Sequence, residues 1–166
     1  KEIFRMTANR RRFVITGLSA ITSIGLKVET FWPNLLAGKS GISANDVWDT
    51  KDFTCKIAGI IRDFSAENYI DKKEAKRLDR VSHFAMAAAR DAWADSGLDI
   101  SKLDPTRVGV CVGSGIGGII TFEQECEKLF KKGPKMVSPF LIPKLMGNAS
   151  AGNIAIMLGL KGPNTC

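Results

Sequence analysis

Histidine is almost absent from this sequence of 166 residues, in which His83 is the only one. Cysteine is sparse as well and forms no CxxC pair; the four cysteines are Cys55, Cys111, Cys126 and Cys166. Zinc sites are built mainly from histidine and cysteine at short spacing, so the sequence predicts neither a zinc site nor a disulfide framework. We expect a structural or surface role for His83, and a buried structural thiol at Cys111 in the apolar run VGVCVG.

Long apolar runs are also missing. No uninterrupted stretch approaches the roughly 20 residues that a helix needs to cross a bilayer, and FVITGL near the basic N-terminus is too short for a signal-peptide core. The contents of 45% hydrophobic and 25% charged residues are ordinary for a soluble globular protein with one core. We therefore expect a soluble, cytoplasmic protein.

Acidic residues are outnumbered, since 24 lysines and arginines oppose 17 aspartates and glutamates and leave a net charge of +7. The basic residues gather at 10–12 and 72–77, with looser members at Lys131, Lys132 and Lys135. Such clusters can bind nucleic acid, an anionic membrane or an acidic protein, or simply form a solvated surface. No aromatic residues interleave with them as a base-stacking platform requires, which argues against nucleic acid.

Predicted strands and helices alternate along the chain. Residues 13–17 (FVITG) and 55–64 read as strands, and a helix starting near Lys27 is ended by Gly38. One long helix is predicted from Lys73 to the stop at Gly97, with enough alanines on its apolar face to require a close neighbour. A further strand, a helix and a Gly/Ala-rich helix follow, at 107–112, 119–130 and 144–160. Alternation of this kind indicates a layered α/β fold.

A glycine-rich loop, GSGIGG at 113–118, joins a predicted strand to a predicted helix. That context suits a phosphate site, but the spacing matches neither G-x-G-x-x-G nor a P-loop, and no lysine follows. The loop therefore does not by itself favour nucleotide binding.

Five ordered motifs together carry a family resemblance: RRFVITGLSAITSIG, LLAGKSGI, RLDRVSHFAMAAARDAWADSGL, RVGVCVGSGIGG and SPFLIPKLMGNASAGNIAIMLGLKGPNT. They resemble the N-terminal part of β-ketoacyl-acyl-carrier-protein synthases, closest to the elongating synthase I/II group. The resemblance implies a thiolase-like α/β fold of two similar halves, of which residues 10–166 supply most of the first, left incomplete. Residues 1–9 are then an N-terminal extension, with KEIFR before Met6 as upstream or added residues.

Members of this family condense an acyl thioester, held on a catalytic cysteine, with malonyl-acyl carrier protein; they are homodimers and need no metal or redox cofactor. The resemblance places no catalytic residue in this chain, because the nucleophilic cysteine is expected about five residues after Cys166. The family's two histidines and lysine follow later, and His83 matches neither histidine. Cys166 as nucleophile after a local deletion is the competing hypothesis, but no helix follows it to lower its pKa.

Two groups of site residues are carried over from the resemblance. Ile116, between the loop glycines, matches the residue that gates the acyl pocket, and Leu141 and Ile142 match residues that line the acyl cavity near the dimer contact. The basic residues that receive the acidic helix of acyl carrier protein match Lys73, Arg77 and Lys135, although Met136 stands where a second basic residue is frequent. The plain alternatives are a tight turn, ordinary core and solvated surface.

Other interpretations of the whole chain remain open. A biosynthetic thiolase or a non-catalytic chain-length-factor-like partner shares parts of the pattern. The chain is alternatively a basic binding module, or a structural half that exposes contact surface until a partner covers it.

Overall fold

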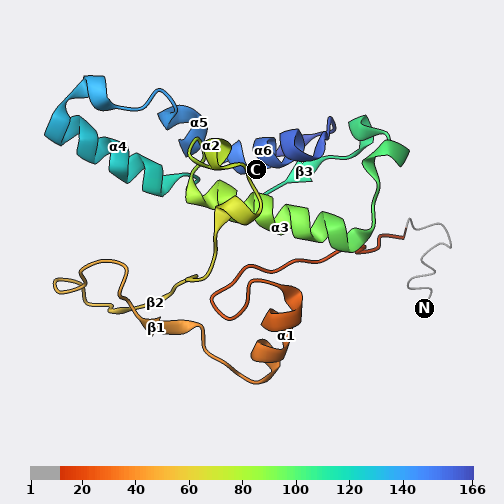
Figure 1. The fold of residues 1–166 in the computed structure, drawn as a ribbon, viewed down its shortest axis with the longest axis horizontal. Helices are drawn as coiled ribbons and strands as arrows, with labels where there is room; N and C mark the ends of the chain where they lie inside the picture. The colour runs from red at the N-terminus through yellow and green to blue at the C-terminus, as the bar shows by residue number, and fades with distance from the viewer. Residues whose placement is uncertain (1–11) are drawn as a thin grey trace, which may run out of the picture.

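The computed structural model describes residues 12–166, so the predicted extension over 1–9 lies outside the described residues. Figure 1 shows α3 (Arg80–Ser96), the longest described helix, running through the middle of the molecule. In this view the C-terminal helices lie above α3, while α1 (Val28–Leu36) and a β-hairpin lie below it.

Helix α3 begins and ends where its sequence dictates. The side chain of Asp79 caps its start by accepting a hydrogen bond of 3.1 Å from the amide of Val81. Gly97 ends it in the left-handed conformation with φ of 64°, which glycine adopts without strain. The predicted stop at Gly97 is confirmed.

The predicted start near Lys73 is wrong, because two helices occupy this stretch. The first, α2 (Lys72–Ala75), is a single turn capped by Asp71, whose side chain accepts hydrogen bonds from the amides of Lys73 and Glu74. The second is α3, which starts at Arg80 and is capped by Asp79. Each aspartate offers its carboxylate to free backbone amides, and the chain turns between the two caps.

The core of the described residues lies where α3 crosses α6 (Ala149–Leu158). Met86 and Ala87 of α3 and Ala151 and Ile154 of α6 are buried. At the crossing, the buried hydroxyls of Ser82 and Ser150 are 3.2 Å apart and form a hydrogen bond. Small side chains let the two backbones approach closely, which confirms the close neighbour expected from the alanines.

Helix α4 (Ile119–Lys132) leads through the 3-10 helix η4 (Pro134–Met136) to the short helix α5 (Leu141–Leu145). The glycine-rich loop lies directly against the end of α5, since the amide of Gly118 donates to the carbonyl of Leu145 over 3.1 Å. A side chain at Gly118 would collide with the carbonyl of Lys144, so glycine is required there for close backbone approach.

Strands are short in the described part of the chain. β3 (Val110–Cys111) pairs in parallel with β4 (Asn164–Thr165), and β1 (Ile42–Ala44) pairs antiparallel with β2 (Ile57–Gly59). The second predicted strand, over 55–64, is thus shortened to β2. Three further 3-10 helices are η1 (Ala66–Asn68), η2 (Ile100–Lys102) and η3 (Pro105–Arg107).

Two sequence predictions about buried strands are wrong. Residues 13–17 form no strand, and Phe13 and Ile15 expose 91% and 82% of their surface. Cys111 is exposed rather than buried. Both results have the same reason, which is that a strand is buried only when neighbouring strands and helices cover it. Within residues 12–166 no strand pairs with 13–17, and β3 has β4 as its only partner.

No helix among the described residues is long and apolar enough to span a membrane.

Candidate functional site

The basic residues predicted to meet a carrier protein are all exposed. Lys73 lies in α2, Arg77 lies in the turn after α2, and Lys135 lies in η4. The sequence predicted one helix through Lys73 and Arg77. Because α2 ends at Ala75, these two residues do not share one face of a continuous helix. None of the three basic side chains takes part in an ion pair with another residue of 12–166, so their charges are open to a partner.

The residues predicted to border an acyl pocket lie on two adjoining segments. Ile116 projects from the glycine-rich loop with 66% of its surface exposed. Leu141 is half-buried and Ile142 is exposed, and both belong to the first turn of α5. The hydrogen bond from the Gly118 amide to Leu145 holds the loop against α5. The structure thus brings the two predicted segments together.

An apolar pocket of about 750 Å³ borders the same loop. Gly117, Ile119 and Ile120 form its wall on the loop side, and Phe84 and Trp48 face it from other elements. Ile116, Leu141 and Ile142 are not among the residues that line it. The pocket therefore adjoins the predicted gate without containing it.

Buried Glu125 was missed by the sequence reasoning. One oxygen of its carboxylate accepts a hydrogen bond of 2.7 Å from the amide of Ser138, and the other bonds the ammonium of Lys128 at 2.6 Å. Those two bonds, that of Lys128 foremost, hold the pKa of Glu125 below its usual value. Its burial could have been predicted from its spacing of four residues from Thr121, which places both residues on the same, buried face of α4.

Asp79 is a second buried carboxylate, and it joins the starts of two helices. Besides capping α3, it accepts hydrogen bonds of 2.8 Å and 2.6 Å from the amide and hydroxyl of Thr121 in α4. This link fixes the exit of the glycine-rich loop relative to α3.

Neither His83 nor Cys166 belongs to a nucleophile–base pair among residues 12–166. The ring nitrogen Nε2 of His83 lies 2.8 Å from the carbonyl of Ala75, in accord with its predicted structural role. The exposed thiol of Cys166 lies 4.0 Å from the carbonyl of Ser114 in the glycine-rich loop. No group of histidine, cysteine, aspartate and glutamate side chains in the described part of the chain could hold a metal ion.

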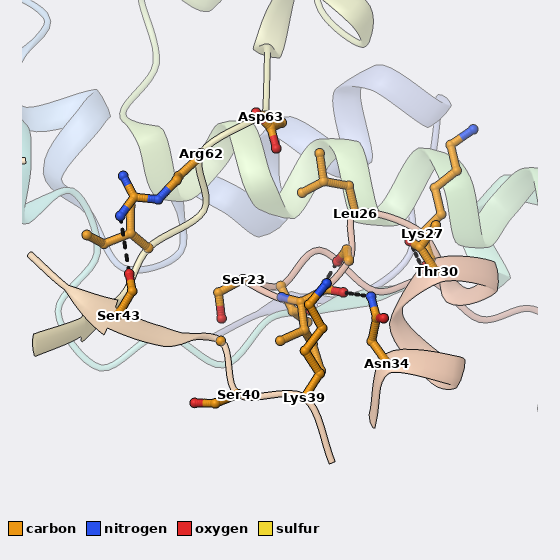
Figure 2. A pocket seen from close by; sticks show the side chains of 15 residues that line it. Ser23, Leu26, Lys27, Thr30, Asn34, Lys39, Ser40, Ser43, Arg62 and Asp63 are labelled. Atoms are coloured by element: carbon orange, nitrogen blue, oxygen red, sulfur yellow. Dashed lines mark hydrogen bonds between the residues drawn. The ribbon is translucent and has the colours of Figure 1, made fainter. Parts of the chain in front are cut away.

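A second pocket, of about 640 Å³, lies apart from these residues, between the loop at 22–27 and β1. Figure 2 shows Ser23, Ser40 and Ser43 around it, with Arg62 at its edge. Arg62 is already neutralised, since its guanidinium contacts both carboxylate oxygens of Asp46 at 2.6 Å. None of the site residues predicted from the sequence lines this pocket.

Comparison with known proteins decides the family. The family model described as "Beta-ketoacyl synthase, N-terminal domain" matches residues 10–166. The chain belongs to the β-ketoacyl synthase family. The thiolase-like α/β fold predicted from the sequence is confirmed by solved ketosynthases. One is the ishigamide ketosynthase/chain length factor, with a TM-score of 0.86 and 29% identity over 95% of this chain and 40% of that one.

Two curated relatives of this β-ketoacyl synthase domain carry the same name. The 3-oxoacyl-[acyl-carrier-protein] synthase 2 of Synechocystis sp. is 43% identical over 157 residues, and that of Staphylococcus aureus strain COL is 45% identical over 157. Each match covers 95% of this chain and 38% of the relative. A solved complex named AntDE:AntF, a type II acyl-carrier protein with its ketosynthase bound to the hexaketide, matches with a TM-score of 0.76 and 26% identity, over 92% of this chain and 40% of that one.

Proposed function

We propose that the full-length protein carrying this domain is a β-ketoacyl-acyl-carrier-protein synthase of fatty-acid elongation. The observation that supports this most is the identity of 43% and 45% to synthases 2 over 95% of the chain. The reaction is a decarboxylative condensation. A cysteine thiolate attacks the acyl thioester and releases the thiol that carried the acyl group. Malonyl-carrier then loses carbon dioxide, and the resulting carbanion attacks the acyl carbon and displaces the cysteine thiolate.

We propose from the family resemblance that the residues that perform these steps lie outside this chain, which spans 38% of each curated relative named above. The domain described here supplies binding surfaces. Ile116, Leu141 and Ile142 contribute to the wall that receives the acyl chain. We further propose that the synthase is a cytoplasmic homodimer and that its acyl pocket reaches the dimer contact near Leu141.

Acyl carrier protein is the proposed partner of the exposed cations, here called the docking residues: Lys73, Arg77 and Lys135. An acidic partner helix is attracted by unpaired positive charge, and such attraction mainly raises the rate of association. The AntDE:AntF complex supports this partner class, since its name gives a ketosynthase bound to an acyl-carrier protein. The chain-length-factor-like alternative is not favoured, because the curated relatives named above are 3-oxoacyl-carrier-protein synthases.

The test is reconstitution of the condensation with purified full-length protein. An acyl primer loaded on acyl carrier protein and malonyl-loaded acyl carrier protein are supplied together. The β-ketoacyl product is measured by mass spectrometry. We expect a product two carbons longer than the acyl primer, with one carbon dioxide released per turnover. Decarboxylation without a β-ketoacyl product, or no reaction with any saturated acyl primer, would overturn the proposal.

A further inference from the structure

Two contacts join the region of the docking residues to the segment proposed to line the acyl pocket. The guanidinium carbon of Arg77 lies 5.5 Å from the centre of the Phe140 ring. The ammonium of Lys144 donates a hydrogen bond of 2.8 Å to the carbonyl of Lys76. Residues 76–77 are therefore tied to α5 at both of its ends, across a sequence separation of 68 residues for the hydrogen bond.

Phe140 occupies the position immediately before α5. Its amide bonds the hydroxyl of Ser138 at 3.1 Å, and its carbonyl accepts the first helical hydrogen bond, from the amide of Lys144 at 3.1 Å. Leu141 and Ile142 follow directly. Phe140 thus begins the backbone segment that carries both predicted pocket residues.

The chain just before Phe140 is held by a separate contact. Glu125 of α4 holds the amide of Ser138 at 2.7 Å. Ser138 and Lys144 are therefore both anchored by polar contacts, and Phe140 lies between the anchors with 42% of its surface exposed. Its contact with the Arg77 guanidinium is the side-chain interaction that joins Arg77 itself to the start of α5.

Arg77 can hold the ring and an acidic partner at the same time. A guanidinium is planar, so it stacks on an aromatic ring with its face while its N–H groups point outward along its edges. Within residues 12–166, the Arg77 side chain makes no hydrogen bond or ion pair, so these donors are free for carboxylates. A carboxylate bound at the edge would fix the plane of the guanidinium over the ring.

We propose that Phe140 is a positioning residue that couples binding of an acidic carrier helix at Arg77 to the order of α5 and of Leu141 and Ile142. This inference rests on the proposed function, which supplies the carrier. Its consequence is that an acyl chain delivered on a carrier protein meets a more ordered pocket wall than one delivered on a small thioester.

The test is hydrogen exchange of two amides that donate along α5, those of Lys144 and of Met146 just after the helix, in the full-length protein with and without acyl carrier protein. Carrier binding should slow exchange at these amides by about two- to fivefold, the range that an exposed cation–π contact can supply. In Phe140→Leu, carrier should bind but leave this exchange unchanged. Phe84→Leu is the matched control, because it removes a ring whose centre lies 4.7 Å from the guanidinium carbon of Arg80, within α3 and not beside Arg77.

A second comparison needs no carrier. Arg77→Gln and Phe140→Leu should each speed exchange of these amides to the same degree. The double variant should show no further increase, because both substitutions remove the same contact between Arg77 and Phe140. Additive effects, or equal protection by carrier in wild type and Phe140→Leu, would overturn the inference. Failure of the proposed docking gives a different result. Carrier then binds neither wild type nor Phe140→Leu, while the effects of Arg77→Gln and Phe140→Leu on exchange remain non-additive.

Discussion

Glu125 and Ser138 are joined by a hydrogen bond of 2.7 Å from the backbone amide of Ser138 to the carboxylate of Glu125. This bond holds the chain against α4 after η4, just before α5, whose end lies against the glycine-rich loop. The carboxylate of Glu125 lies in α4, which ends at Lys132. It thus holds the segment that leads to Leu141 and Ile142, the residues proposed to meet the acyl chain.

Glu125 should stabilise the protein in a pH-dependent way. Its pKa in the folded protein lies below the ordinary 4.5, so its contribution is complete above that pH and is lost as pH falls through the lower folded value. Glu125→Gln should lower the urea midpoint of unfolding at neutral pH, and the difference from wild type should shrink below about pH 4.

Glu127→Gln is the control for this prediction. It removes an exposed pair with Lys131, of 2.6 Å, from the same helix. Because exposed pairs contribute little, its urea midpoint should stay near that of wild type. A difference between Glu125→Gln and wild type that is equal at neutral and acidic pH would contradict the role of the charged carboxylate.

Reversing two docking residues should slow carrier binding. Lys73→Glu with Arg77→Glu is expected to reduce the association rate of acyl carrier protein by about tenfold or more at low salt, measured by surface plasmon resonance. The effect should fade as salt screens the charges. Lys27→Glu with Lys39→Glu changes the net charge equally at exposed positions elsewhere and should change the rate far less. Equal slowing by both double variants would show a general charge effect instead of a docking surface.

The two ends of the glycine-rich loop should differ in their tolerance of a methyl group. Gly118→Ala drives its side chain into the carbonyl of Lys144, so it should destabilise the protein by about 1–3 kcal/mol and displace α5. A side chain at Gly113 meets nothing within 4 Å, so Gly113→Ala should stay within about 0.5 kcal/mol of wild type. Urea unfolding of both variants measures the contrast, and equal losses would mean that close approach to α5 is not the reason for glycine.

The isolated chain of 166 residues should self-associate. Phe13, Val14 and Ile15 expose 91%, 72% and 82% of their surfaces in succession, and such an apolar run favours association with another surface. We expect light scattering to show species larger than 18.0 kDa, and Phe13→Lys with Ile15→Lys to reduce them. A clean monomer at micromolar concentration would contradict this expectation.

Local chemistry accounts for what could be predicted before the structure. Gly97 ends α3 and Gly38 follows α1, because a glycine in the left-handed conformation stops a helix wherever it is placed. The alanine-rich face of α3 correctly required a close neighbour. The break at Asp79 could also have been read, since an aspartate before an apolar run is a helix cap, but the periodicity across it concealed the signal.

Long-range pairing accounts for what could not be predicted. The apolar run at 13–17 has the composition of a buried strand, yet burial depends on a neighbouring strand that residues 12–166 do not provide. The bond between Glu125 and Ser138 likewise depends on how the chain folds back after Gly133. Side-chain type alone marked Glu125 as a surface residue.

The sequence by itself determined the family, the end of α3 at Gly97 and the candidate residues, because motif order and a helix-ending glycine act through neighbouring residues. Tertiary structure alone decided that α5 adjoins the glycine-rich loop and that Arg77 lies against Phe140. Those contacts join segments more than 20 residues apart in the chain, and their formation depends on the packing of whole helices instead of on any local preference.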